Sequence, residues 1–225
     1  MAGEDSGRYS RQQLFWGDET QRRIARGSLL IAGIGGLGAT VAQIMARGGI
    51  ARLHLVDDGV VEWTDLHRQS LYGECDVGRK KVLVAKERLN SINSGVEIIS
   101  HDVRIDAALS MPDDISGVAD CLDNFSSRFA LYQAVPSGMF FVHGGVQGDQ
   151  GQVLTLIKEA SQPLESIMAG CHQPEGTIPV TPDSVFVIAG IMANELFRVL
   201  AGSPGLLDRF LVVDLGGFTF SYLEV

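Results

Sequence analysis

The sequence predicts an α/β fold with a Rossmann-like mixed sheet, in which a parallel βαβ half is followed by an antiparallel half and helices lie on both faces. Three observations support this prediction. Hydrophobic runs alternate with helical patterns over residues 28–145, which is typical of βαβ units and a parallel sheet. A glycine-rich turn, Gly33 to Gly38, joins the first run to the first helical pattern. After residue 145 the runs follow one another across short connections, which favours antiparallel hairpins.

The first half of the chain contains the expected parallel strands. Its apolar runs fit buried strands, and between them small and apolar residues recur at helical spacing. The expected strands are 28–34, 51–57, 96–102, 116–123 and 139–145, and the expected helices are 36–47, 77–93 and 126–136. The polar segment 58–76 shows little periodicity and is too long for a simple turn, a length that is typical of functional loops.

The second half is expected to hold two hairpins, a crossing loop and one apolar helix. A strand at 152–158 follows the preceding strand across residues 148–151, so an antiparallel pairing is expected. Residues 160–183 contain four of the seven prolines and predict a long irregular crossing loop. The helix is expected at 184–201, and a closing hairpin at 209–215 and 218–223 turns at Gly216–Gly217.

A single domain is expected over residues 1–225. It comprises an N-terminal arm (1–27), a first half (28–145), and a crossing loop with the C-terminal half (146–225). The 45% hydrophobic content is enough for one sizeable core. The arm is amphipathic in each of its halves, so it packs on its own domain or reaches a second subunit.

Composition also narrows the location and the partners of the protein. The apolar stretches are strand-sized and interrupted, so no membrane span is expected, and without a targeting segment the expected location is the cytoplasm. A net charge of −9 disfavours nucleic acid as a partner. Cys75, Cys121 and Cys171 are far apart and form no CxxC pair, so neither disulfides nor a zinc site is expected.

The glycine turn predicts a nucleotide site. Gly33, Gly35 and Gly36 let the backbone approach a phosphate, and the following helix N-terminus offers free N–H donors to an anion. Asp57 ends the next strand, where a carboxylate can accept hydrogen bonds from both ribose hydroxyls. Together they indicate a nucleotide with a free ribose diol, without saying which one. A glycine-rich turn without a ligand is the alternative.

A cluster of cations follows in the polar segment. Thr64, Asp65, Arg68 and Gln69 precede Lys81 at the start of a predicted helix. Hydride transfer needs no such cluster, whereas a triphosphate does, because arginine binds phosphate bidentately and lysine supplies a compact charge. A solvated basic surface is the alternative explanation.

A third motif, Asp120 to Asn124, ends a predicted strand at the edge where the glycine turn lies. A carboxylate there, Asp123, can hold Mg²⁺ against phosphate oxygens. The alternative is that Asp123 or Asn124 only caps the next helix.

These motifs resemble the ThiF/MoeB/HesA family of adenylyltransferases, which is homologous to the nucleotide-binding domain of ubiquitin-activating enzymes. Six motifs appear in family order from Arg8 to Asn124. They match the family patterns RYxRQ (residues 8–12), GxGGLG (33–38), the ribose acid (57), SNLQRQ (64–69), VGxxK (77–81) and DCTDN (120–124). The resemblance extends to the final hairpin.

The resemblance implies that Mg-ATP activates the C-terminal glycine carboxylate of a small ubiquitin-like or sulfur-carrier protein, forming an acyl-adenylate and pyrophosphate. Carried over by position, the turn at Gly36 contacts the phosphates, Asp57 the ribose, and Asp123 holds Mg²⁺. Arg68 and Lys81 bind the triphosphate. Thr64, Asp65, Gln69 and Asn124 belong to the matched motifs that line the nucleotide. The resemblance also implies a homodimer in which Arg11 reaches the site of the other subunit.

The sequence departs from the family pattern in two places that bear on activity. Asp65 replaces the usual Asn and adds negative charge near a triphosphate, so it either assists Mg²⁺ or weakens ATP binding. The two CxxC pairs that bind structural zinc in many members are missing. Cys171, followed by His172, lies where some members place a cysteine that bonds covalently to the activated protein, and it is a candidate nucleophile.

Two other functions stay open at this stage. A nicotinamide-dependent oxidoreductase would need only the glycine turn and Asp57, while a non-catalytic binding partner that keeps the fold would explain Asp65 and the missing cysteines. The sequence does not reveal which carboxylate is activated, nor the sulfur donor or downstream acceptor.

Overall fold

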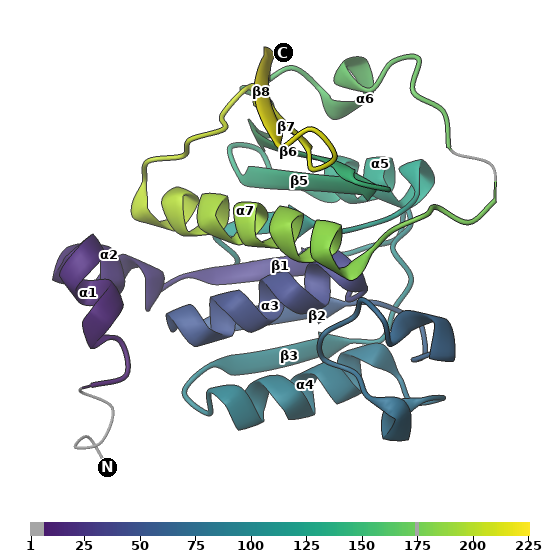
Figure 1. Cartoon of the computed structure of the whole chain (residues 1–225). Coiled ribbons are helices and arrows are strands. Elements are labelled where there is room, and N and C mark those ends of the chain that lie inside the picture. The colour runs from purple at the N-terminus through teal and green to yellow at the C-terminus, as the bar shows by residue number, and fades with distance from the viewer. Residues whose placement is uncertain (1–6, 174–175) are drawn as a thin grey trace.

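The computed structural model describes residues 7–173 and 176–225, so the first six residues of the expected arm and two residues of the crossing loop lie outside the described residues. One eight-stranded sheet runs through the molecule in the order β3-β2-β1-β4-β5-β6-β7-β8 (Figure 1). Its strands are β1 (Ser28–Ala32), β2 (Arg52–Val56), β3 (Glu97–His101), β4 (Gly117–Asp120), β5 (Phe140–Gln147), β6 (Gln150–Ile157), β7 (Arg209–Asp214) and β8 (Thr219–Glu224).

The predicted mixed sheet is confirmed. Strands β1 to β5 pair in parallel, and β5-β6, β6-β7 and β7-β8 pair antiparallel. In the β5-β6 hairpin Gln147 pairs with Gln150, so two residues, Gly148 and Asp149, make the turn. The order places β1 beside β4, which makes a topological switch point between β1 and β4, where open α/β sheets bind ligands.

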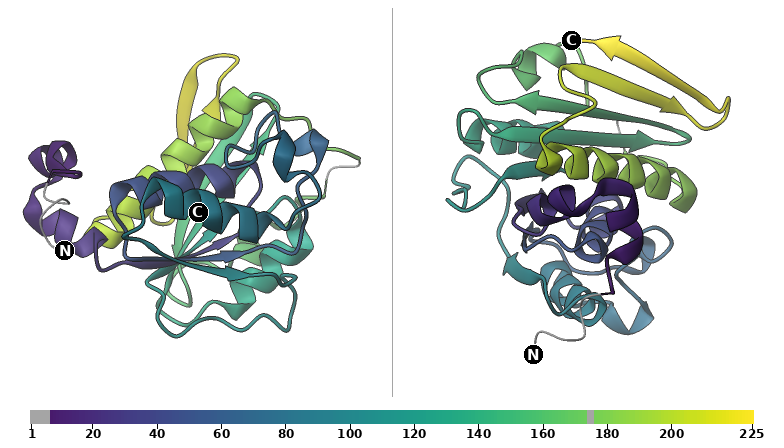
Figure 2. Two further views of the ribbon diagram at one scale, coloured as in Figure 1. Left: turned by 90° about the horizontal axis from the view of Figure 1, so that it is seen from below. Right: turned by 90° about the vertical axis from the view of Figure 1, so that its left-hand side faces the viewer.

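Helices cover both faces of the sheet (Figure 2). They are α1 (Ser10–Trp16), α2 (Asp18–Ile24), α3 (Gly36–Gly48), α4 (Lys81–Ile92), α5 (Phe125–Ala134), α6 (Leu164–Ile167) and α7 (Pro182–Ala201), with 3-10 turns η1 (Trp63–Asp65) and η2 (Glu74–Asp76). The larger hydrophobic core joins α3, α4 and α7 to one face, and a smaller core joins α5 and α6 to the other.

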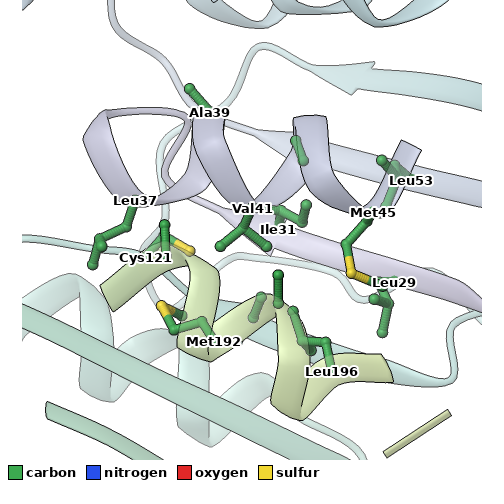
Figure 3. Close-up of a cluster of buried hydrophobic side chains, with 14 of the residues drawn as sticks. Leu29, Ile31, Leu37, Ala39, Val41, Met45, Leu53, Cys121, Met192 and Leu196 are labelled. Carbon is green, nitrogen blue, oxygen red and sulfur yellow. The ribbon is translucent and has the colours of Figure 1, made fainter. Parts of the chain in front are cut away.

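The larger core shows why the sequence pattern predicts these elements. Leu29 and Ile31 alternate on β1, while Val41 and Met45 recur four residues apart on α3, and all four belong to the same buried cluster as Met192 of α7 (Figure 3). All five are fully buried. Full burial of such a side chain contributes about 1.5–3 kcal/mol, so the α3–α7 contact is a main source of stability.

Two element boundaries differ from the sequence prediction by three or more residues. The helix expected from residue 77 begins at Lys81, because Gly78 has a φ of +86° and Lys80 pairs with Val60 in a β-bridge. The strand expected to reach residue 123 ends at Asp120, whose side chain accepts a hydrogen bond from the Leu122 N–H and starts a turn. Both changes place charged side chains at the same sheet edge.

The apolar helix α7 is longer than the expected interrupted stretches. By length and composition it could cross a membrane, which corrects the expectation that no stretch reaches that size. Half of this segment is buried inside the molecule, chiefly against α3 and the sheet, and the core helix of a soluble protein passes the same test. We therefore treat α7 as a core helix.

Candidate active site

A cavity of about 940 Å³ opens at the carboxyl ends of β1, β2 and β4 and continues along β5 and β6. Most of the predicted site residues line this cavity. They are Gly33, Gly35, Gly36, Asp57, Asp65, Arg68, Gln69, Lys81, Asp123 and Asn124. The structure therefore brings together residues that are separated by up to 91 positions in the sequence (33 to 124).

The glycine turn has the geometry of an anion site. Gly33 has a φ of +82°, which ends β1 and turns the chain toward α3. A side chain on Gly38 would overlap the Gly33 carbonyl oxygen, so only glycine lets α3 start this close to the strand. The N-cap residue of α3, Gly35, has no side chain that could occupy the free N–H groups of the first turn. These donors are available to a phosphate at the cavity wall.

Asp57 fastens the end of β2 to this turn. Its Oδ2 accepts a hydrogen bond of 2.7 Å from the Ile34 N–H, and its Oδ1 accepts one of 2.8 Å from the Gly59 N–H. Each carboxylate oxygen can accept a second hydrogen bond, so the anchored group keeps acceptor capacity toward the cavity.

Tyr72 also holds the glycine turn in place, and the sequence does not predict this role. Its hydroxyl donates a 2.7 Å hydrogen bond to the Ile34 carbonyl oxygen. Burial raises the pKa of Tyr72, so the phenol stays protonated and remains a donor. A tyrosine within a polar loop gives no signal in the sequence that it will contact a turn 38 positions away.

Asp65 lies at the centre of the cation cluster. The carboxylate is 6% exposed and lies 3.1 Å from Lys81 Nζ and 3.5 Å from Arg68 Nη2. Gln69 Nε2 donates to it at 2.6 Å and the Glu62 N–H at 3.0 Å. Two cations therefore balance the extra negative charge and leave one net positive charge in this group, and the carboxylate holds both cations at the cavity wall.

Asp123 and Asn124 are adjacent in the sequence but have different surroundings and make different contacts. Asn124 is the N-cap of α5, and its side-chain oxygen accepts a 2.8 Å hydrogen bond from the Ser127 N–H, as the capping alternative expected. Asp123 is exposed and lines the cavity, with an Asn124 amide contact at 3.3 Å. A largely solvated carboxylate at the wall of this cavity suits a hard cation such as Mg²⁺.

Three predicted residues are not among those that line the cavity. Thr64 is exposed, and its carbonyl oxygen accepts a 2.6 Å hydrogen bond from Arg68. Arg11 lies on α1, beyond the amino ends of the strands and so at the opposite edge of the sheet (Figure 1). Cys171 is exposed in the crossing loop, as is His172, while the next residue, Gln173, lines the cavity.

A buried polar network lies under the cavity and was not predicted as a unit. Asp120 is fully buried, forms an ion pair with Arg128, whose Nε lies 2.9 Å away, and accepts a hydrogen bond from His143 Nδ1 at 2.8 Å. Burial opposes ionisation of Asp120, but Arg128 and the His143 hydrogen bond outweigh it and lower its pKa. Burial lowers the pKa of His143, which stays neutral. His143 Nε2 lies 3.2 Å from Gln152 Nε2, at the cavity wall.

The comparisons with known sequences all point to the same family. The model described as "ThiF family" matches residues 9–225. The sulfur carrier protein adenylyltransferase of Thermus thermophilus is 34% identical, over 99% of this chain and 88% of that protein. The sulfur carrier protein ThiS adenylyltransferase of Bacillus subtilis is 31% identical, over 88% of this chain and 62% of that protein. The adenylyltransferase and sulfurtransferase MOCS3 of Aedes aegypti is 33% identical over 97% of this chain.

This chain spans about half the length of the Aedes aegypti relative, 52%. Among solved structures, that of E. coli MccB with ATP matches with a TM-score of 0.84 at 19% identity, over 99% of this chain and 72% of that one. PaaA matches with a TM-score of 0.84 at 21% identity, over all of this chain and 75% of that one. At these identities the structural matches show the fold alone. The sequence matches, which run from the arm to the last strand, decide the family: the chain belongs to the ThiF family of adenylyltransferases.

Proposed function

We propose that the protein uses ATP to adenylate the C-terminal glycine carboxylate of a small sulfur-carrier or ubiquitin-like protein in the cytoplasm. The observation that carries the proposal is the group formed by Asp65, Arg68 and Lys81 at the wall of the glycine-turn cavity. Relatives named as sulfur carrier protein adenylyltransferases support the choice of substrate class.

In the proposed reaction a carboxylate oxygen attacks the α-phosphorus of ATP. The bond from that phosphorus to the bridging oxygen of the β-phosphate breaks, and pyrophosphate leaves with the bond's electron pair. The acyl-adenylate is a mixed anhydride of the carboxylate and AMP. The protein supplies little covalent chemistry here, because its task is to align two anions and to stabilise charge that moves onto pyrophosphate.

The described residues fit this task. The first turn of α3 and the Gly33–Gly36 backbone bind phosphate oxygens, and Asp57 accepts hydrogen bonds from the ribose hydroxyls. Arg68 and Lys81 stabilise the leaving pyrophosphate. Asp123 would hold Mg²⁺, which neutralises phosphate charge when it is bound. Arg11 would complete the site from a second copy of the chain. Within one chain, Arg11 lies on α1, at the opposite end of the strands from the cavity.

Exchange of labelled pyrophosphate into ATP tests the proposal directly. The probe is a ThiS-type carrier protein that ends in Gly-Gly, and the same carrier with a C-terminal amide is the negative control. Exchange that requires both Mg²⁺ and the free carboxylate is the expected result. If the protein neither exchanges pyrophosphate with such a carrier nor binds ATP, the proposal is wrong.

Lys81→Ala separates this function from nicotinamide-dependent oxidation. Lys81 stabilises charge that develops on pyrophosphate, so we expect the variant to lose exchange by about 100-fold or more. Lys86→Ala on the same helix is the matched control, since Lys86 is not among the residues that line the cavity. An oxidoreductase would instead bind NAD and be little affected by Lys81→Ala, an outcome that would favour that alternative.

A further inference from the structure

The far end of the cavity differs in chemistry from the end beside the glycine turn. The glycine-turn end carries Asp57, Asp65, Arg68, Lys81 and Asp123. Among the described lining residues from β5, β6 and β7, none is charged. These residues are Gly145, Val146, Gln147, Gln150, Gly151, Gln152 and Val212. Arg128 of α5, which lines the cavity beside β5, is paired with the buried Asp120. Amide side chains suit a neutral ligand that offers alternating N–H and C=O groups, such as an extended peptide.

Gln152 is distinguished among the glutamines of this end because a buried group fixes its amide. Its Nε2 lies 3.2 Å from Nε2 of His143, which is fully buried. Gly145 is its partner in the β5-β6 register, and a side chain there would come within 3.3 Å of Gln152 Cγ and Nε2. Glycine at position 145 therefore leaves room for the Gln152 side chain at the cavity wall.

The hydrogen-bond partners of His143 decide which way the Gln152 amide faces. Asp120 is an acceptor only, so the proton of the neutral imidazole lies on Nδ1, which donates to Asp120 at 2.8 Å. Nε2 of the ring is then an acceptor, and Gln152 must turn its NH₂ group toward it. The carbonyl oxygen of Gln152 is left for the cavity.

We infer that Gln152 is a specificity-determining residue whose carbonyl oxygen accepts a hydrogen bond from the last backbone N–H of the peptide that is activated, and that Asp120 and His143 set its orientation. This inference rests on the proposed function. A carbonyl oxygen repels a carboxylate and attracts the neighbouring N–H. Binding the N–H here therefore turns the carboxylate away from Gln152 and toward the glycine-turn end of the same cavity, where the proposed function places the α-phosphate of ATP.

The test removes the N–H from the substrate and the amide from the enzyme. The probes are a ThiS-type carrier ending in Gly-Gly and its semisynthetic form ending in Gly-sarcosine, in which a methyl group replaces the last N–H. We expect the wild-type protein to show a KM about tenfold higher for the sarcosine form, the usual size of a lost hydrogen bond in a binding site. Gln152→Leu should raise KM for the glycine form by about the same factor. In this variant the KM values for the two carriers should differ by less than about twofold.

Two further measurements separate this role from a structural one. ATP affinity measured by calorimetry should not change in Gln152→Leu, because the inferred contact is with the peptide. Gln133→Leu, the same change on an exposed residue of α5 outside the cavity, should discriminate like the wild type. If Gln152→Leu does not fold, Gln152→Met keeps the side-chain length and allows the same comparison.

Two outcomes would overturn the inference, and they differ. If Gln152→Leu exchanges pyrophosphate and still discriminates as strongly as the wild type, Gln152 does not bind the N–H, while the proposed function stands. If the wild-type protein exchanges with neither carrier, the proposed function fails and the inference fails with it.

Discussion

Asp65 is a residue whose meaning depends on its neighbours. In the sequence it adds a negative charge beside a predicted triphosphate site. In the structure its buried carboxylate forms ion pairs with Lys81 and Arg68. It also accepts hydrogen bonds from the Gln69 side chain and the Glu62 N–H. Asp65 therefore organises the two cations and, at the same time, competes with a triphosphate for them.

Asp65→Asn tests this competition. An asparagine keeps one acceptor oxygen, which serves the donors on one side only, and it lacks the charge. Because the competing charge is gone, we expect ATP to bind about 3- to 10-fold more tightly, which corresponds to roughly 1 kcal/mol at the effective dielectric near a protein surface. Calorimetric titration with Mg-ATP measures the change. Asp58→Asn removes the same charge from an exposed position in the cavity and should have a smaller effect.

Weaker ATP binding by Asp65→Asn would mean that the anchoring role of Asp65 outweighs its repulsion. A different result, in which the wild type binds no ATP and only the variant does, would favour a non-catalytic member of the family.

At the scale of elements, the junction of β1 and α3 decides whether the cavity has an anion site. The strand must end at Gly33 and the helix must begin within three residues, with its first N–H groups free. The close approach of Gly38 to the Gly33 carbonyl oxygen makes this possible. Asp57 and Tyr72 then fasten the turn through Ile34.

Gly38→Ala should disrupt this junction. The new Cβ would overlap a backbone oxygen, so we expect a loss of more than about 2 kcal/mol in the free energy of unfolding and loss of ATP binding. Gly190→Ala, in helix α7, is the control, because a Cβ there meets open space. The control should be stabilised by about 0.5–1 kcal/mol, the usual helix preference for alanine. Chemical denaturation of both variants measures these changes, and a Gly38→Ala protein as stable as the wild type would contradict the steric argument.

At the scale of the molecule, the cavity lies at the carboxyl ends of the parallel strands. Helices α1 and α2 of the arm lie beyond the amino ends of these strands (Figure 1). One chain therefore does not place Arg11 of helix α1 in its own cavity. A second copy related by two-fold symmetry would exchange arms reciprocally, so that each arm completes the other cavity.

Mixing two inactive variants tests this exchange. In a mixed dimer of Arg11→Ala and Lys81→Ala chains, one site carries both changes and the other carries neither. Random reassociation of equal amounts makes about half of the dimers mixed, so about a quarter of the wild-type exchange activity should return. Recovery of no activity, or dimers that do not form in sedimentation analysis, would contradict the shared site.

Three histidines, two of them buried and one half-buried, predict how the whole molecule responds to acid. Burial lowers the pKa values of His54, His101 and His143. An unfolded histidine takes up a proton near pH 6.5, whereas these take one up only at a lower pH in the folded state, so lowering the pH through that value favours unfolding. We expect the free energy of unfolding to fall between about pH 7 and 5, by at most about 1.4 kcal/mol per pH unit for each extra proton.

Urea denaturation at several pH values measures this slope. His54→Gln should reduce it, because one of the buried groups no longer titrates on unfolding. His67→Gln, at an exposed position, should leave the slope unchanged. Equal slopes in all three proteins would show that burial of these histidines does not control acid stability.

The amino-acid sequence was enough to predict the mixed sheet, the glycine turn, and that Asp57, Arg68, Lys81 and Asp123 come together around one cavity. These features depend on local signals, namely periodicity, turn glycines and charges that follow strands, and the parallel topology alone brings strand ends to one edge. The resemblance to the family rested in addition on the order of the motifs along the chain.

Other features depended on contacts between segments that are distant in the chain. The sequence contains no signal that Asp120, His143 and Gln152 form one chain of hydrogen bonds from three strands, or that Asp65 is held between two cations. Burial makes these contacts matter, because a polar group removed from water must find a partner wherever the fold provides one. Which partner it finds is set by strand register and by the way the loops pack, and neither can be read from a local stretch of sequence.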